Sequence, residues 1–262
     1  MTMTSAVSAA ATPPVGVSIS KARVITMPAT VQPGVNRFAV TSARKNGSAF
    51  QLVRPAPGYS TQDASRDIKK GLEGSNLKAL KRFEANVTLL GGVTADKSPD
   101  TLVVDLDPGT HWALDTNTSD PSKFFVFDVS GDETGNASPQ GTAIRAKSAT
   151  TWAGSPKSIP REGLLNFKND SSNNHFIVLT KLKKGKSYRD FKKWFATEGE
   201  GGPPPVQFNV GLDSGVVSPG HSAAFSYDLP RGSYVMLCFW PDAEMDGMPH
   251  AYMGMHRGIK LT

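Results

Sequence analysis

Short runs in which apolar and polar residues alternate recur along the chain, separated by turns rich in Gly, Pro, Ser and Asp. TLVVDLD (Thr101–Asp107) and AAFSYDL (Ala223–Leu229) are two examples, and alternation with a period of two is typical of a strand with one buried face. Two other segments carry apolar residues at spacings near three and four, which predict amphipathic helices. These residues are Ile68, Leu72, Leu77, Leu80 and Phe83 in one segment, and Tyr188, Phe191, Trp194 and Phe195 in the other.

The order of these segments occurs twice. Gly34–Ile68 and Gly163–Phe195 each run from a short strand through a polar turn into an apolar strand, followed by a Gly, a Ser and an Asp that opens the helical stretch. Gly91–Asp115 and Ser214–Cys238 correspond in the same way. A repeated unit of this size indicates duplicated domains. We therefore predict an all-β protein of two tandem Greek-key β-sandwiches, each with a short helical insertion.

The domain boundaries follow from the repeat and the composition. The first copy spans residues 20–130, a Gly-, Ser-, Pro- and Asp-rich linker spans 131–142, and the second copy spans 143–262. We expect residues 1–19 to form a flexible arm that is able to add a strand to a neighbouring copy of the chain. The arm lacks the basic and apolar regions of a complete secretory signal, but SAVSAAA resembles a signal-cleavage site. A secreted or extracytoplasmic location is favoured.

Charge and known motifs narrow the function classes. The 262 residues carry a net charge of +6, without the aromatic-interleaved basic motif that would indicate a nucleic-acid partner. No apolar run approaches the roughly eighteen residues of a transmembrane segment. Lysines gather on the predicted helices, which is typical of a solvated face or of a docking surface for an acidic partner. The sequence has no nucleophile elbow, phosphate loop, HExxH or CxxC motif, and we expect that the protein is not an enzyme.

Sulfur and imidazole groups are concentrated near the C-terminus. Tyr234–Gly258 contains the only cysteine of the chain, Cys238, two of the five histidines and five of the eight methionines. Cys238, His250 and Met255 follow one another in that order on the predicted closing strands. A Cys, a His and a Met would supply three of the four ligands of a blue-copper centre. A further histidine, His175, lies upstream in the pattern N-x-x-x-N-N-H-F (Asn169–Phe176).

With these motifs, the second copy resembles the cupredoxins, the small copper proteins of the plastocyanin and halocyanin type. The Asn-rich segment before His175, the strand that ends at Cys238, the sequence HAYMGM and the final strand GIKLT carry this resemblance over most of residues 143–262. It implies copper as the cofactor, with His175, Cys238 and His250 as strong ligands and Met255 as the weak axial ligand. Met253 is the alternative axial ligand. The resemblance also implies electron transfer with a redox or acidic protein partner.

Two observations support an alternative without metal. Eleven residues separate Cys238 from His250, more than is typical of the cupredoxins, although the cost of closing a loop grows only slowly with its length. In addition, the first copy has Ser48 at the position of His175 and Asp115 at the position of Cys238. The alternative is a metal-free structural or protein-interaction module, as part of an extracellular assembly. The distinguishing feature is whether the three strong-ligand side chains converge on one point.

A third interpretation concerns the methionines of the same region. Together with His250 they would form an exposed surface that handles copper(I), because thioethers are soft ligands. The methionines in question are Met245, Met248, Met253 and Met255.

Overall fold

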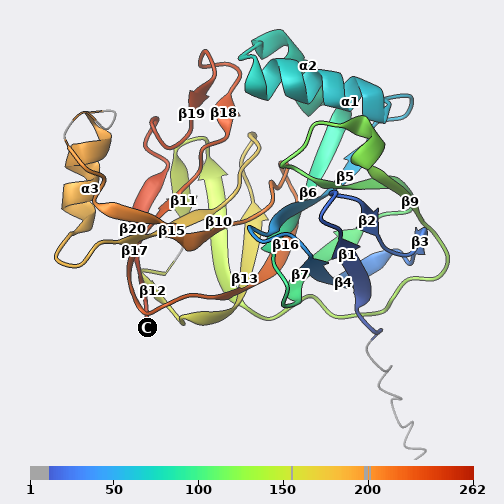
Figure 1. The fold of residues 1–262 in the computed structure, drawn as a ribbon, viewed down its shortest axis with the longest axis horizontal. Coiled ribbons are helices and arrows are strands. Elements are labelled where there is room, and N and C mark those ends of the chain that lie inside the picture. The colour runs from blue at the N-terminus through green and yellow to red at the C-terminus, as the bar shows by residue number, and fades with distance from the viewer. Residues whose placement is uncertain (1–11, 155, 198–199, 201) are drawn as a thin grey trace, which may run out of the picture.

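The computed structural model describes residues 12–262 apart from residues 155, 198–199 and 201 (Figure 1). This part of the chain is predominantly β and forms an eight-stranded sheet, two five-stranded sheets and a two-stranded hairpin. Three short α-helices lie outside the sheets, namely α1 (Thr61–Ile68), α2 (Leu77–Asn86) and α3 (Tyr188–Phe195). The predicted all-β fold with helical insertions is confirmed. No helix within the described ranges is long and apolar enough to cross a membrane.

The eight-stranded sheet runs through the whole molecule in the order β11-β10-β13-β16-β7-β4-β1-β2. We call the residues up to Val129 the first half and those from Thr142 the second half. The halves meet in this sheet where β16 pairs antiparallel with β7, with Phe225 opposite Leu102. The strands are β1 (Val15–Ile19), β2 (Ile25–Thr26), β4 (Gly34–Ser42), β7 (Asp100–Leu106), β10 (Thr142–Ser148), β11 (Thr151–Ala153), β13 (Glu162–Asn169) and β16 (Ser222–Asp228).

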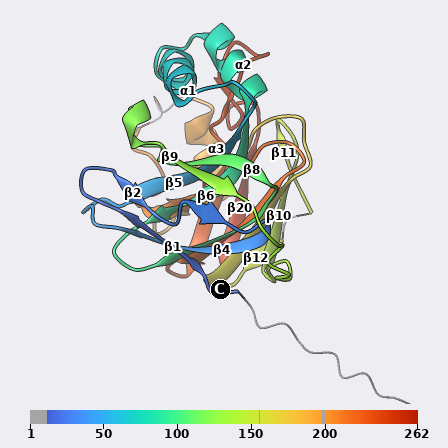
Figure 2. The ribbon, with the colours of Figure 1, turned by 90° about the vertical axis from the view of Figure 1, so that its right-hand side faces the viewer.

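Each half adds a five-stranded sheet to its part of the long sheet, giving a β-sandwich (Figure 2). In the first half the order is β3-β9-β8-β5-β6, and in the second it is β12-β20-β17-β14-β15. The first set is β3 (Thr30–Val31), β5 (Ser48–Pro55), β6 (Val87–Ala95), β8 (Gly109–Asp115) and β9 (Phe125–Val129). The second set is β12 (Ser158–Ile159), β14 (Val178–Leu182), β15 (Val206–Asp213), β17 (Gly232–Leu237) and β20 (His256–Leu261).

The pairings of the first half recur in the second. β1 lies parallel to β4 as β10 does to β13, and β3 lies parallel to β9 as β12 does to β20. β5 lies between β8 and β6, and β14 lies between β17 and β15. Duplication and the division into separate domains remain predictions. The register places Leu52 opposite Ala113 and Leu179 opposite Met236, as expected if Ser48 and Asp115 correspond to His175 and Cys238.

The residues predicted to form the N-terminal arm fall into two groups. Residues 1–11 lie outside the described part of the chain. Val15–Ile19 form β1, which pairs with β2 on one side and with β4 on the other. Both edges of this strand are therefore occupied within the chain.

The helical insertions begin where the sequence predicts. The Ser60 side chain caps α1 and exchanges hydrogen bonds with Asp63, and Ser187 and Asp190 form the same capping box at α3. The first insertion is not one helix, because a π-helical turn (Lys69–Glu73) ends α1 and Asn76 caps a second helix, α2. Each half thus carries its insertion between the second and third strands of its five-stranded sheet.

The contact between the halves continues along β6. The amide of Gly215 donates to the carbonyl of Gly92 at 2.9 Å, and a Cβ atom on Gly215 would lie only 2.1 Å from the Gly92 nitrogen. Glycine is therefore required for this approach. The buried Gln51 side chain bonds both backbone groups of Val216. Val217 then bridges Leu90 of β6 on one side and His175 on the other, so the first half contacts the backbone of the candidate site.

Candidate metal centre

His175 is held by the loop between β13 and β14. Asn169, the last residue of β13, donates from Nδ2 to the carbonyls of Asn173 and Val217 at 2.7 and 2.8 Å. Its Oδ1 accepts from the amide of Ser171 at 3.1 Å. The amide and carbonyl of His175 are both bonded to Val217. The Asn-rich segment therefore forms a loop closed by hydrogen bonds that fixes the backbone before the histidine.

Cys238 and His250 are brought together by a hairpin. Cys238 follows β17, and the strands β18 (Pro241–Asp242) and β19 (Met248–Pro249) then pair antiparallel. Beyond the hairpin, the amide of His250 donates to the carbonyl of Trp240 at 3.0 Å, and the amide of Ala251 donates to that of Cys238 at 2.7 Å. The eleven-residue separation is thus taken up by an ordered hairpin, and the two residues lie side by side.

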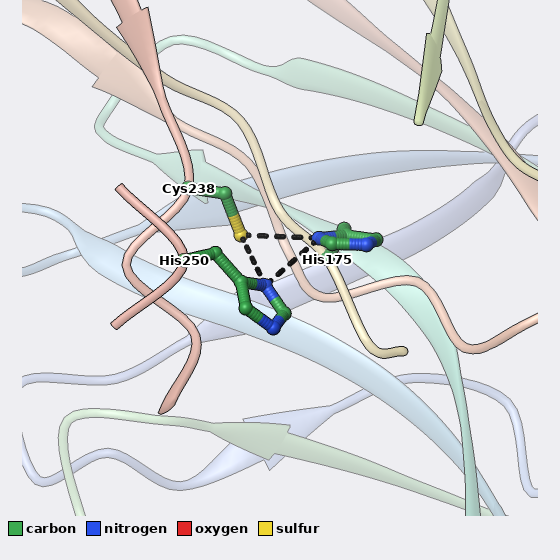
Figure 3. Close-up of side chains that lie close together, drawn as sticks. All are labelled: His175, Cys238 and His250. Carbon is green, nitrogen blue, oxygen red and sulfur yellow. Dashed lines mark hydrogen bonds between the residues drawn. The ribbon is translucent and has the colours of Figure 1, made fainter. Parts of the chain in front are cut away.

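Three donor atoms meet at this point (Figure 3). The distances are 3.4 Å from His175 Nδ1 to Cys238 Sγ, 3.6 Å from Cys238 Sγ to His250 Nδ1, and 3.1 Å between the two Nδ1 atoms. The point equidistant from the corners of this triangle lies about 2 Å from each atom, near the roughly 2.0–2.3 Å of metal bonds to imidazole nitrogen and thiolate. The structure therefore brings together the three residues predicted as strong ligands.

All three side chains are fully buried, and burial sets their protonation. Burial, with the neighbouring His250, lowers the pKa of His175 to about 3. Burial also lowers the pKa of His250, although Asp242 opposes this. Burial raises the pKa of the Cys238 thiol to about 12. At neutral pH both imidazoles are thus neutral, as metal ligands must be, and the thiol keeps its proton until a cation replaces it.

One nitrogen of each clustered histidine lacks a hydrogen-bond partner in the described part of the chain. Among the described residues, Nε2 of His175 and Nε2 of His250 are buried without a hydrogen bond. Asp242 Oδ2 lies 3.7 Å from His250 Nε2 and accepts from Asn173 Nδ2 at 3.4 Å. The Nδ1 atoms of both histidines and Sγ of Cys238 face one another instead, so an ion at the centre of the triangle would contact all three. Two imidazoles and a thiolate in a trigonal arrangement fit copper.

The predicted axial ligand Met255 and its alternative Met253 follow His250 closely in the sequence. Met255 is fully buried, its carbonyl accepts from the Cys238 amide at 3.3 Å, and its amide donates to the His250 carbonyl at 2.9 Å. Met253 is partly exposed, and its amide also donates to the His250 carbonyl, at 3.1 Å. The backbone of Met255 is thus bonded to two of the three clustered residues. The ligand roles of all of these residues remain predictions.

The remaining sulfur and imidazole groups of the region lie elsewhere. Met245 and Met248 are exposed on the hairpin, whereas Met255 is buried, so the four methionines do not share one exposed surface. His256 packs against α3, where its Nδ1 lies 2.7 Å from the hydroxyl of Tyr188.

Sequence reasoning missed the residues that surround the cluster. The ring of Trp152, from β11, lies 6.4 Å from that of His175. Glu84, in α2 of the first half, accepts hydrogen bonds from Asn174 and Trp240, which flank the clustered residues. Asp242 lies within the hairpin beside His250. The only local signal was the position of Asn174 and Asp242 near predicted ligands, and nothing in the sequence connects Glu84 to them.

No protein-family model and no curated protein matches this sequence. Among solved structures, the dithionite-reduced auracyanin of Roseiflexus castenholzii is 20% identical. The match spans 47% of this chain and 99% of the auracyanin chain, with a TM-score of 0.29. The copper nitrite reductase of Nitrosomonas europaea is 13% identical and covers 95% of this chain and 94% of its own, with a TM-score of 0.26. A multi-copper oxidase from Pediococcus acidilactici is 10% identical over 95% of this chain and 58% of its own, with a TM-score of 0.25.

These likenesses concern the fold. The chain forms β-sandwiches, as the resemblance of its sequence to the cupredoxins implies, with a His-Cys-His group at one end of the second sandwich. The expectation that the protein is not an enzyme is corrected, because nitrite reductase and multi-copper oxidase, which are enzymes, are among the matching structures. The absence of familiar hydrolase and phosphate motifs was no guide, since a copper centre uses none of them.

Proposed function

We propose that the protein binds one copper ion through His175, Cys238 and His250 and uses it for one-electron transfer. The observation that carries this proposal is the triangle of buried donor atoms, with sides of 3.1–3.6 Å. Bound copper would supply a one-electron redox couple, which thiolate and imidazole ligands together support in both oxidation states.

The chain's own residues prepare the site in three ways. His175 and His250 present neutral imidazoles because burial lowers both pKa values. Cys238 holds its proton on Sγ and releases it when a cation binds. The surrounding β-sandwich excludes water from all three side chains. Because the donors already lie within bonding reach of a common point, little movement is required when the ion binds.

The test is a titration of the purified protein with copper(II). We expect one equivalent to produce an intense blue colour from thiolate-to-copper charge transfer, and Cys238→Ser to abolish it. Ser48→Ala, at the corresponding position of the first half, is the matched control and should leave the colour unchanged. A colourless protein whose thiol remains free would contradict the proposal and would support the metal-free structural module.

We also propose an acidic redox partner, which docks at α3. Exposed lysines surround this helix. The helix packs on the segment that carries the donors, where the Phe195 ring is stacked on that of Tyr252 at 4.4 Å and meets that of Phe239 edge to face at 6.4 Å. Attraction between opposite charges speeds association and weakens with salt. Lys183, Lys184, Lys186, Lys192 and Lys193 are the residues concerned. Electron exchange with an acidic acceptor protein should slow as salt rises, and a lysine-to-glutamate variant in α3 should weaken that dependence.

A further inference from the structure

Helix α2 of the first half lies beside the hairpin β18–β19 of the second half (Figure 1), and the turned view shows the same neighbourhood (Figure 2). Lys81 of this helix forms an ion pair with Glu244 of the hairpin at 2.8 Å, in an exposed position. One turn further along α2, Glu84 reaches the base of the hairpin. The half of the chain that lacks the donor residues therefore touches the segment that carries them.

The candidate metal centre has two arms, namely the loop that ends at His175 and the segment from Cys238 to His250. The Glu84 carboxylate forms hydrogen bonds with both arms. Its Oε1 accepts a hydrogen bond from Nε1 of Trp240 at 2.7 Å and another from Nδ2 of Asn174 at 3.2 Å. Trp240 lies two residues after Cys238, and its carbonyl accepts from the His250 amide. Asn174 lies immediately before His175. A single oxygen of Glu84 thus links the neighbours of all three donors.

The Asn174 side chain is linked to the first half at both ends, directly through Glu84 and indirectly through Ser218. While its Nδ2 donates to Glu84, its Oδ1 accepts from Oγ of Ser218 at 2.8 Å, and that hydroxyl accepts from the amide of Leu89 at 2.9 Å. Asn174, Ser218 and Trp240 are all almost completely buried. Since a buried polar group left unpaired is costly, these bonds favour one position for both arms.

We propose that Glu84 is a positioning residue that closes the two donor-bearing arms against each other, and that this is a role of the first half. The link to copper rests on the proposed function, whereas the closure itself belongs to the metal-free protein. Burial raises the pKa of Glu84 in spite of its hydrogen bonds from Trp240 and Asn174. Both hydrogen bonds are donated to the one Oε1 atom, so glutamine, which keeps an Oε1 acceptor, should replace glutamate.

The first experiment measures the reaction of Cys238 with an aromatic disulfide reagent in metal-free protein. Cys238 is fully buried and is the only cysteine, so the rate reports opening of the arms. Glu84→Ala removes both hydrogen bonds and should raise the rate by about ten- to a hundredfold. Glu84→Gln should restore the wild-type rate. Glu73→Ala, at an exposed carboxylate of the same half, is the matched control and should change nothing.

Trp240→Phe tests the same bond from the other side and removes only the Nε1 donor. It should also raise the thiol rate, and combined with Glu84→Ala it should add less than the sum of the two single effects, because both remove one interaction. Equal rates in wild type, Glu84→Ala and Trp240→Phe would overturn the proposal. This result does not depend on copper, so it is distinct from failure of the proposed function.

The second experiment uses copper-loaded protein. Glu84→Ala should shift the charge-transfer band and speed copper loss about ten- to a hundredfold, as is typical for changes around metal ligands, while Glu84→Gln should match wild type. An unchanged spectrum and copper-loss rate in Glu84→Ala would contradict a positioning role. If wild-type protein takes up no copper, the proposed function fails, and the thiol rates still decide whether Glu84 closes the arms.

Discussion

Two corresponding buried positions of the two β-sandwiches, Asp115 and Cys238, differ in the partners that surround their side chains. In the first half, Asp115 is fully buried but saturated with partners. It accepts from Arg23 at 2.5 Å, from the Ala49 amide at 3.1 Å, and from the amide and Nδ2 of Asn117 at 3.1 and 2.9 Å. In the second half, Cys238 occupies the corresponding position, and its neighbours are two histidines whose Nδ1 atoms face one another and the sulfur.

The two sites differ in whether the charge and hydrogen-bonding groups of their buried side chains are balanced within the protein. Burial tends to raise the pKa of Asp115, but the hydrogen bonds from Asn117, Arg23 and Ala49 outweigh it and hold the pKa below its usual range. The first site therefore carries its own counterion. The second site contains three neutral donor groups, Nδ1 of His175, Nδ1 of His250 and Sγ of Cys238, and within the described residues no charged side chain pairs with them as Arg23 pairs with Asp115.

The largest expected effect comes from making the second site resemble the first. Cys238→Asp places a carboxylate beside the two neutral histidines, where the backbone of Phe176 and Trp240 can donate but, in the part of the chain that the structure describes, no arginine takes the place of Arg23. An uncompensated buried charge costs roughly 3–5 kcal/mol, and we expect the free energy of unfolding of the metal-free protein to fall by about this amount in urea titrations. Cys238→Ser is the control and should cost far less. Equal stability of both variants would show that the two sites are not electrostatically different.

The second prediction concerns Asp115 of the first half, whose carboxylate is saturated with hydrogen bonds. Asp115→Asn keeps the shape and one acceptor oxygen but removes the charge that pairs with Arg23, whose side chain is partly exposed. Because Arg23 can turn toward water, we expect a moderate loss of about 2 kcal/mol in the free energy of unfolding, within the range for hydrogen bonds to charged groups. Copper uptake by the second half should be retained. A loss of copper binding without a loss of stability would contradict this division between the sites.

Much of this arrangement could be predicted from local sequence. The capping serines, the alternating strands and the Asn-rich turn before His175 depend on neighbouring residues, and they lie where the sequence placed them. The hairpin could not be read in this way, because Pro241 and Pro249 argue against strands, yet they face each other in β18–β19. The Glu84–Trp240 bond joins residues 156 positions apart. Such a contact depends on how the halves pack, and no local pattern encodes it.

A third prediction concerns acid, because the first site has no histidine where the second has His175. Folding keeps His175 neutral, with a pKa of about 3, whereas the unfolded chain binds a proton below about pH 6.5. The unfolded state thus binds more protons in this window, and stability decreases as pH falls from about 6.5 towards 3. Relative to His175→Gln, the metal-free wild type should lose about 1.4 kcal/mol per pH unit. If the free energies of unfolding of wild type and His175→Gln changed in parallel between about pH 7 and pH 4, folding would not keep His175 neutral.

The smallest expected effect distinguishes between Met253 and Met255 as the axial ligand. Met255 is fully buried and its backbone is bonded to Cys238 and His250, whereas Met253 is partly exposed. Replacing a buried methionine by leucine usually costs less than about 1.5 kcal/mol, so neither variant should unfold the protein. If Met255 is the axial ligand, Met255→Leu should leave the blue colour but change the reduction potential, because the axial ligand tunes it. Met253→Leu should leave both unchanged. A change of potential in Met253→Leu alone would assign the axial position to Met253.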